Sequence, residues 1–194
     1  MKKMMMIAAM MIAAISANAQ NEVGQITLKP FVGMNLASVT KTDNSKMRVG
    51  LAAGVEAEYG VAENFGISAG VLYSMQGVKY DYVEDGYTID CTAKLDYINI
   101  PILAQYYPVK GLAIKAGVQP AFNVSHKFKM EAAGESLEET LAGVKTFDLS
   151  IPVGLSYEYA NFVLDARYNI GLTKVKNNGK NGVIQITLGY KFAL

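Results

Sequence analysis

The chain has 194 residues, a formal net charge of +1, and a composition that is 51% hydrophobic but only 18% charged. This near-neutral balance argues against a nucleic-acid-binding surface and against any partner recognised mainly through charge. Cys91 is the only cysteine, so an internal disulfide framework is excluded.

The first residues carry the features of an export signal. Lys2 and Lys3 precede a twelve-residue apolar run over residues 4–15, and Ala17-Asn18-Ala19 then gives a small-x-small cleavage pattern. The alternative is a transmembrane anchor, but a helix that spans a bilayer needs about 20 apolar residues. We therefore expect residues 1–19 to be a signal peptide and residues 20–194 to be one mature domain. No cysteine stands at the cleavage site, so we do not expect a lipid anchor there.

Apolar and polar residues alternate strictly in eight stretches of the mature chain, which is the pattern of strands with one apolar and one polar face. The expected strands are 26–39, 48–60, 65–80, 93–107, 112–128, 147–159, 162–173 and 184–194. The seventh is the clearest, with Leu164, Tyr168 and Ile170 on one face and Asp165 and Arg167 on the other.

The connections alternate between long and short. The long polar ones are 40–46, 81–90, 129–145 and 174–182, and the short ones lie near 62–64, 108–111 and 160–161. Within 129–145, Ser136-Leu137-Glu138-Glu139 matches a helix capping box, so we expect one or two helical turns there, with a chance match as the alternative.

Three features indicate that the apolar face points outward, toward lipid. The polar face consists of Gly, Ala and Ser with isolated charges, which suits the narrow lumen of an eight-stranded barrel better than a water-facing surface. Long loops that alternate with tight turns are typical of outer-membrane barrels. Aromatic residues gather near the tight turns, as in an interfacial girdle: Tyr59, Phe65, Tyr106, Tyr107, Tyr157, Tyr159, Phe162, Tyr190 and Phe192. The sequence thus predicts an all-β fold, an eight-stranded antiparallel up-and-down transmembrane β-barrel.

Three segments resemble the PorT-like outer-membrane β-barrel family of Bacteroidota. The run from Asp96 to Tyr107, DYINIPILAQYY, is similar to a strand of that family with the pattern Y-x-E-I-P-L-L-L-K-Y. Asn99 and Gln105 replace its acidic residue and its lysine, so amides would stand where the family has an ion pair. Residues 166–173, ARYNIGLT, and the closing strand 186–192 also resemble that family. The resemblance implies a small Gram-negative outer-membrane protein without common catalytic residues, and a secretion-linked role by resemblance only.

Few side chains could carry chemistry. His126 is the only histidine, and we expect it on the surface where a strand enters a loop; Cys91 is expected in or beside an exposed loop. Glu56 and Glu58 share one face and could be an acid/base pair, but we favour an interior salt-bridge network with Lys29, Lys115 or Arg167. We therefore expect no catalytic, cofactor-binding or metal-binding residues, no cofactor and no enzyme activity.

The expected function is that of an integral outer-membrane protein with a structural or interaction role and its specificity in the long extracellular loops. Expected partners are outer-membrane lipids, the barrel-assembly machinery during insertion and a protein at the loops; nucleic acid is not expected, and the barrel should be monomeric. The alternatives are a soluble lipocalin-like binding barrel in the periplasm and a small lipid-modifying barrel enzyme. An outward apolar face at Leu164, Tyr168 and Ile186 would rule out the first.

Membrane fractionation combined with gel electrophoresis tests the barrel. We expect the protein in the outer-membrane fraction, with an unheated sample migrating differently from a boiled one because a closed barrel keeps its hydrogen bonds in detergent. A protein recovered wholly from the soluble periplasm would contradict this prediction.

Overall fold

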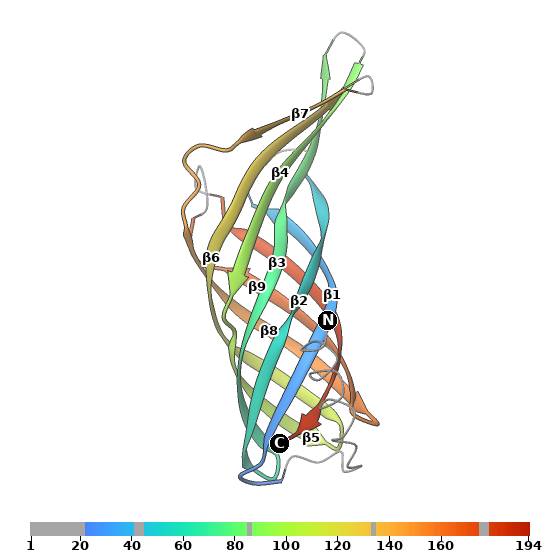
Figure 1. Cartoon of the computed structure of the whole chain (residues 1–194), viewed down its shortest axis with the longest axis vertical. Coiled ribbons are helices and arrows are strands. Elements are labelled where there is room, and N and C mark those ends of the chain that lie inside the picture. The colour runs from blue at the N-terminus through green and yellow to red at the C-terminus, as the bar shows by residue number, and fades with distance from the viewer. Residues whose placement is uncertain (1–21, 41–44, 85–86, 133–134, 175–178) are drawn as a thin grey trace, which may run out of the picture.

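Figure 1 shows the computed structural model, which describes residues 22–40, 45–84, 87–132, 135–174 and 179–194. Its strands are β1 (Ile26–Val39), β2 (Ser45–Ala62), β3 (Phe65–Glu84), β4 (Tyr87–Asn99), β5 (Ile102–Val109), β6 (Leu112–Ala132), β7 (Glu135–Thr140), β8 (Phe147–Tyr159), β9 (Phe162–Gly171), β10 (Asn181–Tyr190) and β11 (Phe192–Ala193). The expected signal peptide lies outside the described residues. None of the described residues forms a helix long and apolar enough to cross a membrane.

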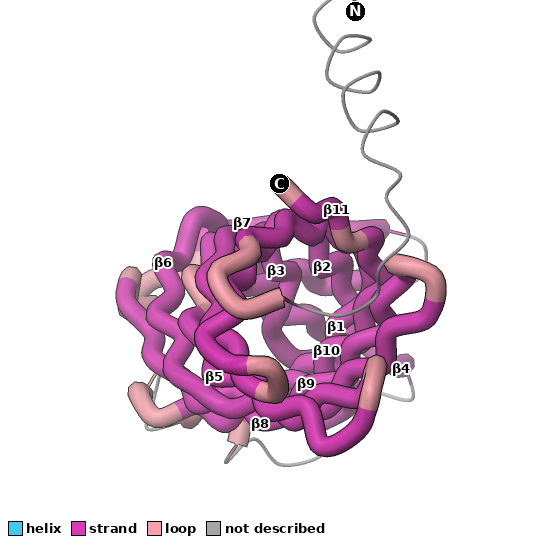
Figure 2. Tube along the Cα trace, turned by 90° about the horizontal axis from the view of Figure 1, so that it is seen from below, coloured by secondary structure: helices cyan, strands magenta, loops and turns pink. Residues whose placement is uncertain are grey.

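The strands close into a barrel, seen along its axis in Figure 2. Neighbours in the wall are antiparallel, and β1 pairs with β10 from Phe31↔Gly189 to Val39↔Asn181, which leaves no open edge there. β4 and β5 act as one wall strand interrupted at Ile100 and Pro101, and β10 and β11 act as another. Because β7 lies above the wall, the barrel has the eight strand positions that the sequence predicts.

The tight turns match the sequence prediction. They are at 63–64, 110–111 and 160–161. Ala160 and Asn161 have φ values of 48° and 69°, the left-handed pair that a two-residue hairpin needs. The C-terminus is tied to this end of the barrel, where the Leu194 N–H donates to the Ile26 carbonyl at 3.0 Å.

Side chains alternate across the wall as predicted. Along β9, Leu164 and Tyr168 are 55% and 48% exposed, whereas Asp165 and Arg167 are 1% and 3% exposed. Ile186 on the neighbouring β10 also faces outward. A soluble binding cup would enclose its apolar side chains, so the outward direction rules out the lipocalin-like alternative.

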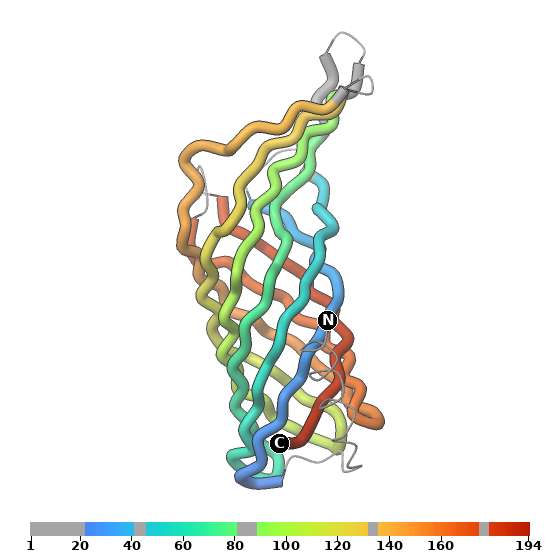
Figure 3. The backbone as a smooth tube through the Cα atoms, in the orientation of Figure 1, coloured from blue at the N-terminus to red at the C-terminus, as the bar shows by residue number. Residues whose placement is uncertain are grey.

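The wall is much taller on one side than on the other (Figure 3). β3 continues to Glu84, β4 begins at Tyr87, and β6 runs to Ala132, so these strands extend beyond the outer ends of β8 and β9. The prediction of a polar excursion over 81–90 was therefore wrong for most of its length, because its residues continue the ladder. The expected turn at Asp85-Gly86 lies outside the described residues.

The predicted helical turns after residue 129 were also wrong. Ser136 to Glu139 belong to β7, in which Leu137 pairs with Met130 and Glu138 pairs with Lys129. A Ser-x-x-Glu spacing fits a strand as well as a helix start, and the long β6 offers a complete ladder partner. Tertiary pairing therefore overrides the local capping signal.

Two arginine substitutions in β2 test which residues face lipid. Val55 lies near the middle of the strand and Val61 near its tight-turn end, and both are exposed. We expect Val55→Arg to lower the free energy of unfolding in lipid vesicles by about 2–4 kcal/mol and Val61→Arg by about 0–1 kcal/mol, because arginine costs most at the bilayer midplane. Urea unfolding measures both; equal effects would contradict the assigned depth.

Candidate functional site

Five charged side chains from four strands meet in the lumen. Lys29 of β1 lies 2.8 Å from Glu56 of β2, and Lys115 of β6 lies 2.7 Å from Asp165 of β9. Arg167 joins the two pairs: its Nη2 donates to Glu56 Oε2 at 2.8 Å and its Nε donates to Asp165 Oδ1 at 2.6 Å. We call these five residues the central ion network.

Small residues make room for the central ion network. Gly154 stands between Lys115 and Arg167 in the register of β6, β8 and β9. A Cβ built on Gly189 would lie 2.9 Å from Cγ of Lys29. The glycines of the polar face thus leave space in the lumen for long charged side chains.

A second group of charges lies toward the tight-turn end. Lys191 Nζ is 2.7 Å from Glu158 and 3.3 Å from Glu58, and the Tyr107 hydroxyl donates to Glu58. Tyr107 therefore points into the lumen, so its predicted place in the outer girdle was wrong. Tyr59, Tyr106 and Phe162 are exposed on the outer wall, as expected for the girdle.

The two glutamates that could have been a catalytic pair belong to different groups. Glu56 is held by Lys29, Lys115 and Arg167, the partners predicted for an interior network. Glu58 pairs instead with Lys191, which sequence reasoning did not name as its partner. Alternation along the last strand places Lys191 in the lumen, so the sequence pattern could have identified Lys191 as a possible partner of Glu58. With their oxygens engaged by cations, these carboxylates brace the wall.

Polar and apolar groups fill the outer end of the lumen. Asp148 accepts hydrogen bonds from Thr173 and from Asn181, whose Nδ2 is 2.8 Å away. Leu141 and Val144, from the segment after β7, pack on a cluster of Leu95, Tyr97 and Ala121. This segment thus folds inward and covers the mouth beside Tyr97, which is fully buried.

Neither isolated candidate lies where the sequence analysis placed it. His126 is inside β6, half-buried, with Nδ1 2.8 Å from Asn123 Oδ1. Cys91 is buried within β4. Both corrections have one cause, since the strands continue beyond the barrel. Among the described residues, no three His, Cys, Asp or Glu side chains are grouped so that they could hold a metal ion.

Outside the barrel, β3, β4, β6 and β7 form one sheet with two different faces. The face that continues the lumen is apolar, with Val78, Cys91, Phe128 and Met130. The face that continues the lipid side is charged and contains the ion pairs Lys94–Glu138 at 3.0 Å, Lys127–Glu138 at 3.8 Å and Lys129–Glu131. We call these four strands, above Asn123 of β6, the extracellular sheet.

Neighbouring lysines lower the pKa values of two glutamates in the extracellular sheet. A hydrogen bond from Lys129 lowers the pKa of Glu131, and one from Lys94 lowers the pKa of Glu138. Both carboxylates are therefore ionised at neutral pH. Any stability that these pairs add is present above the ordinary glutamate pKa and is lost as the pH falls through the lowered value.

Removing one carboxylate from the central ion network tests its structural role. Glu56→Gln leaves three buried cations beside one anion, so we expect a loss of about 3–5 kcal/mol of unfolding free energy in vesicles. Lys29→Met in the same protein should recover part of that loss, because it restores a more even balance. Glu138→Gln, which breaks exposed ion pairs, should lower the unfolding free energy much less, because water screens these pairs. Equal losses for Glu56→Gln and Glu138→Gln would contradict the prediction.

The chain is similar in fold to solved structures of other proteins. Ail, the attachment invasion locus protein of Yersinia pestis, aligns over 88% of this chain and 100% of its own, with a TM-score of 0.50 and 16% identity. Ail in complex with the heparin analogue sucrose octasulfate aligns over the same shares, with a TM-score of 0.52 and 16% identity. Neisserial surface protein A covers 86% of this chain and 96% of its own, at a TM-score of 0.46 and 14% identity. No curated protein matches the chain.

The family described as "Outer membrane protein beta-barrel domain" matches residues 18–177, which is most of the chain. Its description agrees with the closed antiparallel wall, the outward apolar face and the inward charges. The chain belongs to the outer membrane protein beta-barrel domain family and is an outer-membrane protein.

Proposed function

We propose that this barrel is a non-enzymatic interaction protein that anchors the extracellular sheet in the outer membrane and binds a protein partner along β7. The observation that carries the proposal is the pairing of β7, which among the described strands has β6 as its one neighbour. An exposed strand with one free edge is a template for the addition of a further strand.

The free edge of β7 can be assigned residue by residue. The Leu141 N–H donates to the His126 carbonyl, and Leu141 continues the register in which Glu139 opposes Phe128. In an antiparallel pair, every second residue turns its N–H and C=O groups toward the neighbour. Ser136, Glu138 and Thr140 therefore direct their backbone groups to the open side.

Side chains along β7 indicate what kind of strand would fit. Leu137 is 54% exposed and lies beside Met130, so it offers an apolar contact on the lumen-side face. Glu138 and Glu139 add negative charge on both faces. The β7–β6 register has no bulge, and Ser136 to Thr140 contain no proline, so neither of these two means of blocking strand addition is present in this segment. The complementary partner is an extended segment that alternates apolar and basic residues.

A role without catalysis is supported by the engagement of the buried carboxylates with lysine and arginine. We also propose PorT-like membership within the family, on the motifs 96–107 and 166–173, without carrying over a secretion role. Export with cleavage before Gln20, insertion by the barrel-assembly machinery and a monomeric state in outer-membrane lipid complete the proposal.

Proline substitutions at the free edge test the proposal. A phage library of extended peptides is selected against the protein in lipid nanodiscs, and the selected peptides are titrated against variants. Ser136→Pro with Thr140→Pro removes two outward N–H groups and keeps the bonds to β6, so we expect at least about a tenfold loss of affinity. The matched control, Ser136→Ala with Thr140→Ala, should bind like the unmodified protein.

Two results would contradict the proposal. One is equal peptide affinity for the proline and alanine variants, and the other is a selection that yields no peptide dependent on β7. Unchanged heat-modifiable gel mobility of each variant establishes that its barrel is folded.

A further inference from the structure

Four lysines of the extracellular sheet lie on two rungs of one face. The single rung between them turns its side chains to the opposite face. The register aligns Gly77, Lys94, Lys127 and Thr140 on one rung and Lys79, Thr92, Lys129 and Glu138 on the other. Along β3, Lys79 continues the alternation of the lipid-facing Val71 and Tyr73. The four lysines therefore lie on the outer side of the wall and not over the mouth of the barrel.

Charge changes sign with distance from the barrel. Among the described residues, Glu138 is the one acidic side chain on these two rungs, against four lysines of β3, β4 and β6 and Lys46 of β2, which lies opposite Lys79. On the rung beyond them, Asp90 opposes Glu131. Lys94 and Lys127 oppose each other directly, which is unfavourable for like charges, and they share the single carboxylate of Glu138. These two rungs thus have an excess of positive charge.

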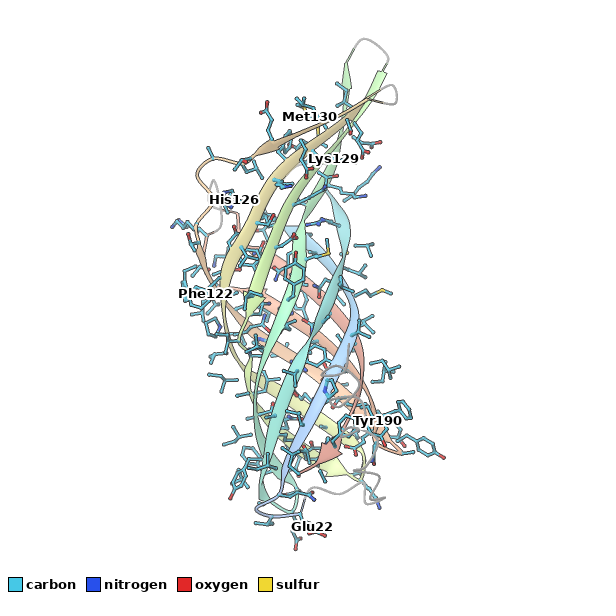
Figure 4. The ribbon with its side chains drawn as sticks, viewed as in Figure 1. Glu22, Phe122, His126, Lys129, Met130 and Tyr190 are labelled. Atoms are coloured by element: carbon cyan, nitrogen blue, oxygen red, sulfur yellow. The ribbon has the colours of Figure 1, made fainter. Side chains whose placement is uncertain are left out.

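The distance of the lysines from the bilayer midplane can be calculated from their positions along β6. The ten residue steps from Leu112 to Phe122 rise about 25 Å at the usual strand tilt, which is the height of the apolar band of a membrane barrel. Phe122 is exposed and contacts Phe147, with ring centroids 5.7 Å apart, so it lies at the outer edge of this band. Figure 4 shows Phe122, His126 and Lys129 in this order along β6, away from the tight turns.

Lys127 is five residues beyond Phe122, roughly 12 Å farther from the midplane at the same tilt. The headgroup layer of each leaflet is roughly 5–8 Å thick. Lysine side chains bend toward the membrane interface and keep their ammonium groups beside polar headgroups. Lys94 and Lys127 can therefore reach the headgroups from above, and Lys79 and Lys129 lie one rung farther out.

We propose that Lys79, Lys94, Lys127 and Lys129 form a binding site for the phosphate groups of anionic lipids in the outer leaflet. Glu138 and Glu131 pair with three of these lysines, and the phosphates supply the negative charge that these two carboxylates do not. The neighbouring apolar wall contacts the acyl chains of the same lipids. The site lies on the flank of the sheet, whereas the free edge of β7 presents backbone groups, so the two surfaces can be tested independently.

The test uses spin-labelled lipids in phosphatidylcholine bilayers that contain the protein. We expect labelled phosphatidylglycerol to be preferred over labelled phosphatidylcholine at the protein surface, and the preference to fall at high salt. Replacing all four lysines by glutamine should reduce the preference about fivefold or more. The control replaces Lys110, Lys145, Lys174 and Lys180 by glutamine; these residues are exposed and lie elsewhere, so their loss removes the same charge and should leave most of the preference.

Three results would overturn the proposal. They are an unchanged preference in the variant that lacks the four lysines, an equal loss in the control variant, and tight binding of inorganic phosphate by the protein in neutral detergent. The last result would indicate a site for a soluble anion instead of a lipid. Heat-modifiable gel mobility verifies that both variants are folded.

Discussion

The structure depends on the absence of water from the bilayer core. Every backbone N–H and C=O at that depth needs a partner within the protein, and a closed antiparallel wall provides one for each. The β1–β10 ladder is what closes the wall. With the wall closed, the two faces of every strand meet two different media, and the alternation of the sequence becomes a division between lipid and lumen.

That division places charges inside, where they are stable only when paired. The central ion network meets this condition with three cations and two carboxylates, joined by Arg167 between Glu56 and Asp165. Such a network costs much of its own stabilisation in lost hydration. Its value lies in joining β1, β2, β6 and β9 across the lumen. A residue pair that resembled an acid/base site is thus part of the support of the wall.

The sequence alone predicts the barrel, because apolar and polar residues alternate strictly along each strand of the wall. The bounds of β1 and β8, the three tight turns and the outward face of β9 all follow from alternation and turn chemistry. Individual partners were harder, since Lys191 and Glu58 are far apart in sequence and meet only through closure of the wall. Tyr107 was misplaced because the interface rule for aromatics does not distinguish the two faces of a strand.

The extracellular part could not be predicted in the same way. Polar residues at 81–90 and 129–145 have the composition of loops, and the capping box favoured helical turns. Residues 81–84, 87–90, 129–132 and 135–140 nevertheless form strands, because β3, β4 and β6 continue beyond the barrel and supply ladder partners. The result is a barrel with one tall side, whose sheet offers a free edge along β7 and a lysine-rich flank above the lipid.

The periodicity of lipid exposure along β9 tests the direction of the apolar face most directly. Single spin labels in a Cys91→Ser background, placed at Leu164, Ala166, Tyr168 and Ile170 and at the lumen positions Val163 and Asn169, are probed for collision with oxygen in bilayers. We expect high accessibility to oxygen at the first four positions and low accessibility at the last two. The opposite phase, or no alternation, would contradict a barrel with its apolar face toward lipid.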